Sequence, residues 1–98
     1  MRIKLLSTAL EDLYEARLFY EKQGEGLGEY FFDSLFSDID SLILYAGIHH
    51  RVLGYHRMLA KRFPYAIYYK LEQEKVAIVW RVLDLRRDPK RIQQSLKS

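Results

Sequence analysis

The sequence contains no cysteine and no apolar run of membrane-spanning length. The absence of cysteine excludes disulfides, thiolate metal sites and cysteine nucleophiles, and it is typical of proteins of the reducing cytoplasm. Acidic residues begin at Glu11, which is too early for a secretory signal peptide. A G-x-S-x-G elbow, a P-loop and a G-x-G-x-x-G turn are also missing. We therefore expect a soluble cytoplasmic protein that uses no cofactor and does not associate with membranes.

Charge is distributed unevenly along the chain. Residues 1–50 hold 4 Lys/Arg and 9 Asp/Glu, a balance of −5, whereas residues 51–98 hold 12 Lys/Arg and 4 Asp/Glu, a balance of +8. The 98 residues, 49% of them hydrophobic, are enough for one domain over 1–98 with an ordinary core. The uneven charge of the two halves predicts that the C-terminal half meets an anionic partner, either nucleic acid or an acidic protein. The alternative is a basic face that is merely solvated.

A helical hairpin is predicted in the first half of the chain. Thr8 and Glu11 have the spacing of a capping box, and a helix over about 9–23 follows them. After a glycine-rich turn, a second helix is predicted over about 28–46, with Gly47 as its stop. The apolar stripe of the first helix comprises Leu10, Leu13, Tyr14, Arg17 and Tyr20. The stripe of the second comprises Phe32, Leu35, Phe36, Ile39, Leu42, Ile43 and Ala46, and we expect it to be core.

Short β-like segments make up most of the remaining sequence. Gln73 and Glu74 form the tip of a tight turn whose type the sequence leaves open. Asp88-Pro89 resembles a helix start and predicts a short helix over roughly 90–96. The order β-α-α-β-β-β with a helical tail predicts an α+β fold, in which the helical hairpin packs on a small antiparallel sheet. The predicted strands cover residues 2–7, 55–62, 65–72 and 75–84.

No metal or acid–base site is evident in the sequence. His49, His50 and His56 lack a recognised ligand spacing, so we interpret them as surface loop residues. The carboxylates are predicted to face solvent from the helices, which leaves paired-carboxylate catalysis without a basis. The groups that remain are basic or phenolic and fall on or just after the predicted sheet: Arg57, Lys61, Arg62, Tyr65, Tyr68, Arg81, Arg86, Arg87, Lys90 and Arg91.

Two interpretations of these basic and phenolic groups are open. Cations neutralise phosphates and tyrosine rings stack on bases, so the surface could bind RNA, or cleave it without a metal. Alternatively, rings such as Tyr65 and Tyr69 are core residues and the arginines keep the sheet soluble. For the tyrosines we favour the core interpretation. For Arg86 and Arg87, at a strand end beside Asp88-Pro89, we favour a function.

Three segments together resemble the ParE branch of the RelE/ParE toxin superfamily, the small toxins of bacterial type II toxin–antitoxin pairs. They are residues 62–69 (RFPYAIYY), residues 76–83 and residues 86–89 (RRDP). The resemblance implies a βααβββ toxin fold and a cognate antitoxin that wraps the toxin and neutralises it. The N-terminal residues that also fit the family are Ala9, Asp12, Leu13, Ala16, Tyr20 and Gly26-Leu27-Gly28.

The resemblance implies one of two activities. ParE-type toxins poison DNA gyrase, whereas RelE-type toxins cleave mRNA in the ribosome with Lys, Arg and a C-terminal Tyr. Here Ala66 stands where that set would have an arginine, and no tyrosine follows Pro89. These departures favour a gyrase inhibitor that is not an enzyme, with target-binding residues Arg62, Arg86, Arg87, Lys90 and Arg91.

Other outcomes stay open at the level of sequence. One is a metal-independent, ribosome-dependent mRNA endoribonuclease that uses Arg57, Lys61, Arg62 and Arg86. Another is an inactive or RNA-binding relative of the toxins. Without its antitoxin, the protein could also form a homodimer through uncovered apolar surface.

Overall fold

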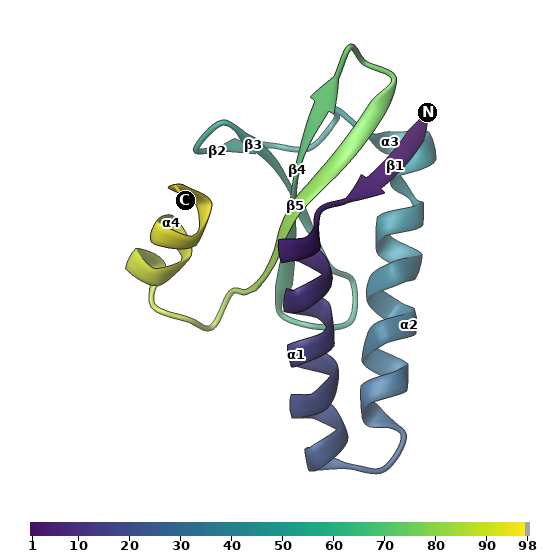
Figure 1. Ribbon diagram of the computed structural model, residues 1–98, viewed down its shortest axis with the longest axis vertical. Coiled ribbons are helices and arrows are strands. Elements are labelled where there is room, and N and C mark those ends of the chain that lie inside the picture. The colour runs from purple at the N-terminus through teal and green to yellow at the C-terminus, as the bar shows by residue number, and fades with distance from the viewer. Residues whose placement is uncertain (98) are drawn as a thin grey trace.

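A computed structural model describes residues 1–97 (Figure 1). The α+β class and the predicted order of helices and strands are confirmed. Two short elements were not predicted, a one-turn helix α3 and a two-residue strand β2. The elements are β1 (Arg2–Leu5), α1 (Ser7–Gln23), α2 (Leu27–Asp40), α3 (Leu42–Tyr45), β2 (Arg51–Val52), β3 (Tyr55–Leu59), β4 (Tyr65–Glu72), β5 (Val76–Asp84) and α4 (Pro89–Lys97).

The sheet has five strands in the order β1-β5-β4-β3-β2. Strands β2 to β5 form an antiparallel meander, but β1 runs parallel to β5. The sheet is therefore mixed rather than wholly antiparallel. The helical hairpin carries the chain from β1 to the opposite edge of the sheet. The meander then returns strand by strand, so its last strand, β5, lies beside β1 and runs parallel to it. Within residues 1–97, no helix is both long enough and apolar enough to cross a membrane.

The two faces of the sheet are covered differently. Helices α1 and α2 cover one face, and α4 packs against part of the other (Figure 1). Along β4, Tyr65, Ile67 and Tyr69 point into the larger core, whereas Ala66 and Tyr68 point toward α4. This alternation follows from the two-residue period of a strand. The interpretation of the tyrosines as core residues is confirmed, because all three rings are buried.

The start of α1 differs from the predicted capping box. The helix begins at Ser7, two residues before the start at Ala9 that the motif requires, and no side chain caps it. The Thr8 hydroxyl instead donates to the carbonyl oxygen of Trp80 at 2.9 Å, which joins the first turn of α1 to β5. The buried stripe is also rotated from the predicted one, so that Tyr14 and Arg17 are exposed. Its members are Ala9, Leu13, Ala16 and Tyr20.

The predicted second helix is interrupted at Ser41. The Ser41 hydroxyl donates to the main-chain oxygen of Asp38 at 2.5 Å, a local bond that competes with the helical pattern. The chain continues as α3, from which Ile43 and Leu44 project into solvent instead of the core. The strand predicted over 55–62 is also shorter than expected, because it ends at Leu59.

Close packing of the hairpin depends on Gly28. A Cβ at this position would lie 2.5 Å from the carbonyl oxygen of Arg17, so any side chain would force α1 and α2 apart. The carboxylate of Glu21 accepts hydrogen bonds from the amides of Gly26 and Gly28, at 3.1 and 3.0 Å. It thereby satisfies amides at the start of α2 that have no helical partner.

The β4–β5 turn has a backbone that its residues do not favour. Gln73 and Glu74 have φ values of 51° and 56°, and the amide of Lys75 donates to the oxygen of Glu72 at 3.0 Å. Two successive residues with positive φ define a type I′ turn, for which Asn-Gly is preferred.

Replacing the tip by Gln73→Asn with Glu74→Gly should therefore stabilise the fold by about 1 kcal/mol, since both new residues tolerate the left-handed region. The free energy of unfolding in urea measures this. Glu25→Gly, in a turn where φ is not positive, is the control and should give no gain. If both variants gained the same stability, the positive φ values of Gln73 and Glu74 would not be the cause of the gain.

Candidate functional site

Helix α1 is joined to β5 by a partly buried ion pair between Asp12 and Arg81. Both oxygens of Asp12 accept from the guanidinium, from Nε and from Nη2, each at 2.8 Å. The same carboxylate accepts from the amide of Val82 at 3.0 Å. Hydrogen bonding to Asp12 raises the pKa of Arg81 above its usual value. The prediction that Asp12 faces solvent is therefore wrong.

A β-bulge explains how Arg81 reaches Asp12. Tyr69 pairs with Val79 and Tyr68 with Arg81, so Trp80 is an extra residue in β5. A bulge increases the local twist and re-aims the side chains beside it. On the helix, Asp12 lies between Ala9 and Ala16, whose small side chains allow α1 to approach the strand. That alanine spacing is the sequence feature from which the contact could have been found.

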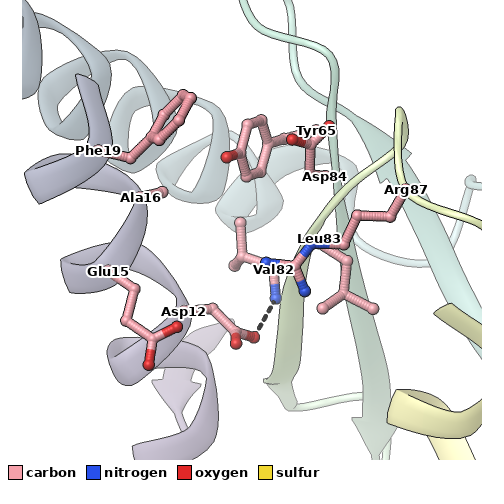
Figure 2. Close-up of a pocket in the computed structure, with 9 residues that line it drawn as sticks. All are labelled: Asp12, Glu15, Ala16, Phe19, Tyr65, Val82, Leu83, Asp84 and Arg87. Atoms are coloured by element: carbon pink, nitrogen blue, oxygen red, sulfur yellow. Dashed lines mark hydrogen bonds between the residues drawn. The ribbon is translucent and has the colours of Figure 1, made fainter. Parts of the chain in front are cut away.

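Beside this ion pair, a cavity of about 400 Å³ lies between α1 and the end of β5. We call it the α1–β5 cavity. Figure 2 shows Glu15, Ala16 and Phe19 on the helical side, facing Tyr65 and residues 82–84 of the sheet. Arg87 lines its outer end. The cavity thus has an apolar middle with charged groups at its rim.

The exposed Arg86 side chain is anchored by hydrogen bonds to other residues of the chain. Its Nε and Nη2 donate to the two oxygens of Asp84 at 3.0 and 2.8 Å, and Nη2 also donates to the Tyr20 hydroxyl at 3.2 Å. Hydrogen bonding to Asp84 raises the pKa of Arg86. Burial on its own would raise the pKa of Asp84, but the bonds and charge of Arg86 outweigh it and lower that pKa. Arg86 therefore links the end of β5 to α1 as well as exposing charge.

The other predicted target-binding residues keep their charges available. Arg62, Arg87, Lys90 and Arg91 are exposed, and within residues 1–97 none of them forms an ion pair. The loop that carries Arg62 lies against the end of β5, because the amide of Leu85 donates to the oxygen of Pro64 at 2.8 Å. We call this part of the molecule, formed by Arg62, Arg86, Arg87, Lys90 and Arg91, the cationic end.

The residues of the endoribonuclease alternative are only partly gathered, since Arg62 and Arg86 belong to the cationic end but Arg57 lies apart from them. Arg57 lines a cavity between β3 and α4, on one face of the sheet. Lys61 lines a groove next to α3, on the face covered by the hairpin. Tyr68 is fully buried, so its ring is not available for stacking on a base. Burial raises the pKa of Tyr68, although the nearby Arg57 opposes the shift.

His49 and His56 belong to a packed cluster around Tyr69, whereas His50 is exposed. His56 is buried and stacks on the Tyr69 ring with centroids 5.0 Å apart, so its assignment to a surface loop is wrong. The Nδ1 atom of His49 lies 2.5 Å from the Tyr69 hydroxyl, whose oxygen accepts from the amide of Gly47 at 2.8 Å. In the described part of the chain, no group of three potential ligands could hold a metal ion.

His49 makes stability depend on pH. Burial, and then the charge of His56, lower the pKa of His49 below its usual 6.5. The unfolded chain consequently binds a proton at this residue more readily than the folded chain, and stability should fall as the pH drops below about 6.5. The loss should be smaller in His49→Asn, whose Oδ1 can accept from Tyr69 in place of Nδ1. Urea midpoints at about pH 7.5 and about pH 5.5 measure it, with exposed His50→Asn as the control.

If His49→Asn and wild type lost the same stability over that interval, another group would be responsible.

Loss of the Asp12–Arg81 ion pair should destabilise the fold strongly. Asp12→Ala removes three hydrogen bonds and leaves a largely buried guanidinium without its anion, so we expect a loss of about 2–3 kcal/mol. The neighbouring exposed Glu11→Ala should change stability by less than about 0.5 kcal/mol. Equal effects of the two substitutions in thermal unfolding would contradict the role given to the pair.

Comparison with known proteins agrees with the resemblance seen in the sequence. Comparison with curated proteins gives no match. Among solved structures, the chain is similar to one from "Chromosomal ParDE TA system from P. aeruginosa", with a TM-score of 0.78. The alignment covers 87% of this chain and 96% of that chain at 18% identity, which shows a shared fold. The family model for "ParE toxin of type II toxin-antitoxin system, parDE" matches residues 3–89, and the chain therefore belongs to the ParE toxin family.

Proposed function

We propose that this chain is the toxin of a type II toxin–antitoxin pair in the cytoplasm, and that it inhibits DNA gyrase through its cationic end. The observation that carries the proposal is the set of four exposed cations without ionic partners, Arg62, Arg87, Lys90 and Arg91, in a chain of the ParE family. Exposed cations on one end of a small protein attract phosphates and carboxylates and accelerate encounter with an anionic partner. The DNA-bound enzyme offers both kinds of anion.

The proposed action is binding rather than catalysis. Metal-free RNA cleavage would require a cationic set and a base arranged around one phosphate. Arg57 and Lys61 line separate cavities on opposite faces of the sheet, and Arg86 is engaged by Asp84. The endoribonuclease alternative would therefore need these residues to move together.

The proposed antitoxin would cover the α1–β5 cavity and the neighbouring face of α1. Phe19 lines the cavity and is exposed, and Leu18 beside it in the helix is also exposed, whereas Tyr14 stacks on Phe32 of α2. An antitoxin segment with apolar side chains for this face and acidic residues for Arg87 would be complementary to it. Such segments are commonly disordered alone and fold on binding. Neutralisation would follow because the bound segment screens the cationic end from its target.

A supercoiling assay with purified gyrase, relaxed plasmid and ATP tests the gyrase proposal. Wild type should inhibit supercoiling, and Arg87→Ala with Arg91→Ala should need at least about tenfold more protein for the same effect, which corresponds to about 1.4 kcal/mol of binding. Lys22→Ala with Lys75→Ala removes two exposed charges elsewhere and should inhibit like wild type. Arg86→Ala is a poor substitute for this test, because it also breaks the contacts with Asp84 and Tyr20.

Equal potency of the two double variants would overturn the role of the cationic end. A folded wild-type protein that leaves gyrase active but cuts mRNA on ribosomes would replace the proposal with the endoribonuclease alternative.

A further inference from the structure

A groove of about 320 Å³ lies between the end of α2, helix α3 and strand β3. We call it the α3 groove. It shares no lining residue with the α1–β5 cavity. Its walls are apolar and comprise Tyr45, Ile48, Met58 and Leu59, while Asp38, Ser41, His49 and Lys61 provide its polar atoms. The groove therefore has the composition of a binding site, with a few polar groups in an apolar surround.

Large apolar side chains project into solvent around this groove. Leu44 is 78% exposed and Ile48 is 73% exposed, and Ile43, Tyr45 and Leu59 are each more than half exposed. Of these five residues, Tyr45, Ile48 and Leu59 line the groove, and Ile43 and Leu44 are neighbours of Tyr45 in α3. Exposed apolar residues that cluster in this way mark an interaction surface, whereas scattered ones do not.

The groove also holds two opposite charges that do not pair with each other. Asp38 is only 5% exposed, and its Oδ2 accepts from the main-chain amide of Lys61 at 3.1 Å. Its Oδ1 has no hydrogen-bond partner among residues 1–97. The ammonium group of Lys61 is exposed and forms no ion pair in the described chain. One anion and one cation are thus both present and both without an ionic partner.

We propose that the α3 groove is the interface between two copies of this chain related by a two-fold axis. A two-fold interface uses the same patch twice, so the patch must be complementary to itself. This one carries protruding Leu44 and Ile48 together with an apolar groove that can accept them, and Asp38 together with Lys61. In the dimer each Lys61 ammonium meets the free Oδ1 of the partner's Asp38. Asp38 is already largely desolvated, which removes part of the usual cost of burying an ion pair.

This dimer gives a location to the self-association that the sequence left open. No residue of the cationic end or of the α1–β5 cavity lines the α3 groove, although Arg62 follows Lys61 directly in the chain. The dimer is tested by its molecular mass, whereas the proposed gyrase inhibition is tested by supercoiling. Either proposal can therefore fail while the other stands.

Sedimentation velocity of the full chain without antitoxin, from about 1 to about 100 μM, tests the proposal. Wild type should reach the mass of a dimer. Leu44→Glu with Ile48→Glu should remain monomeric, and because both side chains are exposed the fold should persist, as checked by circular dichroism. Tyr14→Glu with Leu18→Glu, two exposed apolar residues on α1, is the matched control and should dimerise like wild type.

The charge contact has its own variant. Lys61→Glu should raise the dimer dissociation constant at least tenfold, because it places a second carboxylate opposite Asp38, whereas Lys22→Glu should not. A monomeric wild type at the highest concentration would overturn the proposal. So would dimerisation of Leu44→Glu with Ile48→Glu, or assemblies that keep growing with concentration, since a two-fold interface closes at two copies.

Discussion

The Asp12–Arg81 ion pair, with its third bond to the amide of Val82, is the contact on which the arrangement of this molecule depends. It joins α1 to β5 at the bulge, where the strand would otherwise have an irregular and unsatisfied backbone. The cavity on one side of this pair, and the end of β5 that follows it, take their positions from it. The surface that we propose for target binding is therefore built on a largely buried charge pair.

The basic residues of the second half divide into two classes. Arg81 and Arg86 are engaged by carboxylates within the fold, and their charges stabilise the contact between α1 and β5. Arg62, Arg87, Lys90 and Arg91 have no such partner in the described chain, so their charges are free to act on another molecule. The positive balance of residues 51–98 includes both classes and six further Lys/Arg residues. Only the second class supports an argument about a partner.

Local periodicity predicted much of this fold. The alternation in β4 placed Tyr65 and Tyr69 in the core, because a strand's period leaves no other choice once one face is buried. The parallel pairing of β1 could not be predicted, since it is set by where the hairpin returns the chain. The break at Ser41 was hidden because apolar residues continue past it. Leu42 stays in the core, but Ile43, Leu44 and Tyr45 project into solvent. Asp12, Asp38 and His56 were misassigned because polar residue type was taken to mean exposure, whereas each has hydrogen-bond partners that permit burial.

We propose that the cationic end is the surface that meets the target. Hydrogen–deuterium exchange of the full chain, alone and saturated with DNA gyrase, is the measurement that decides this. Amide exchange should become slower in the 60–64 loop and over residues 85–91, with the β4–β5 turn unchanged. Slower exchange confined to that turn or to α3, with residues 85–91 unaffected, would contradict it.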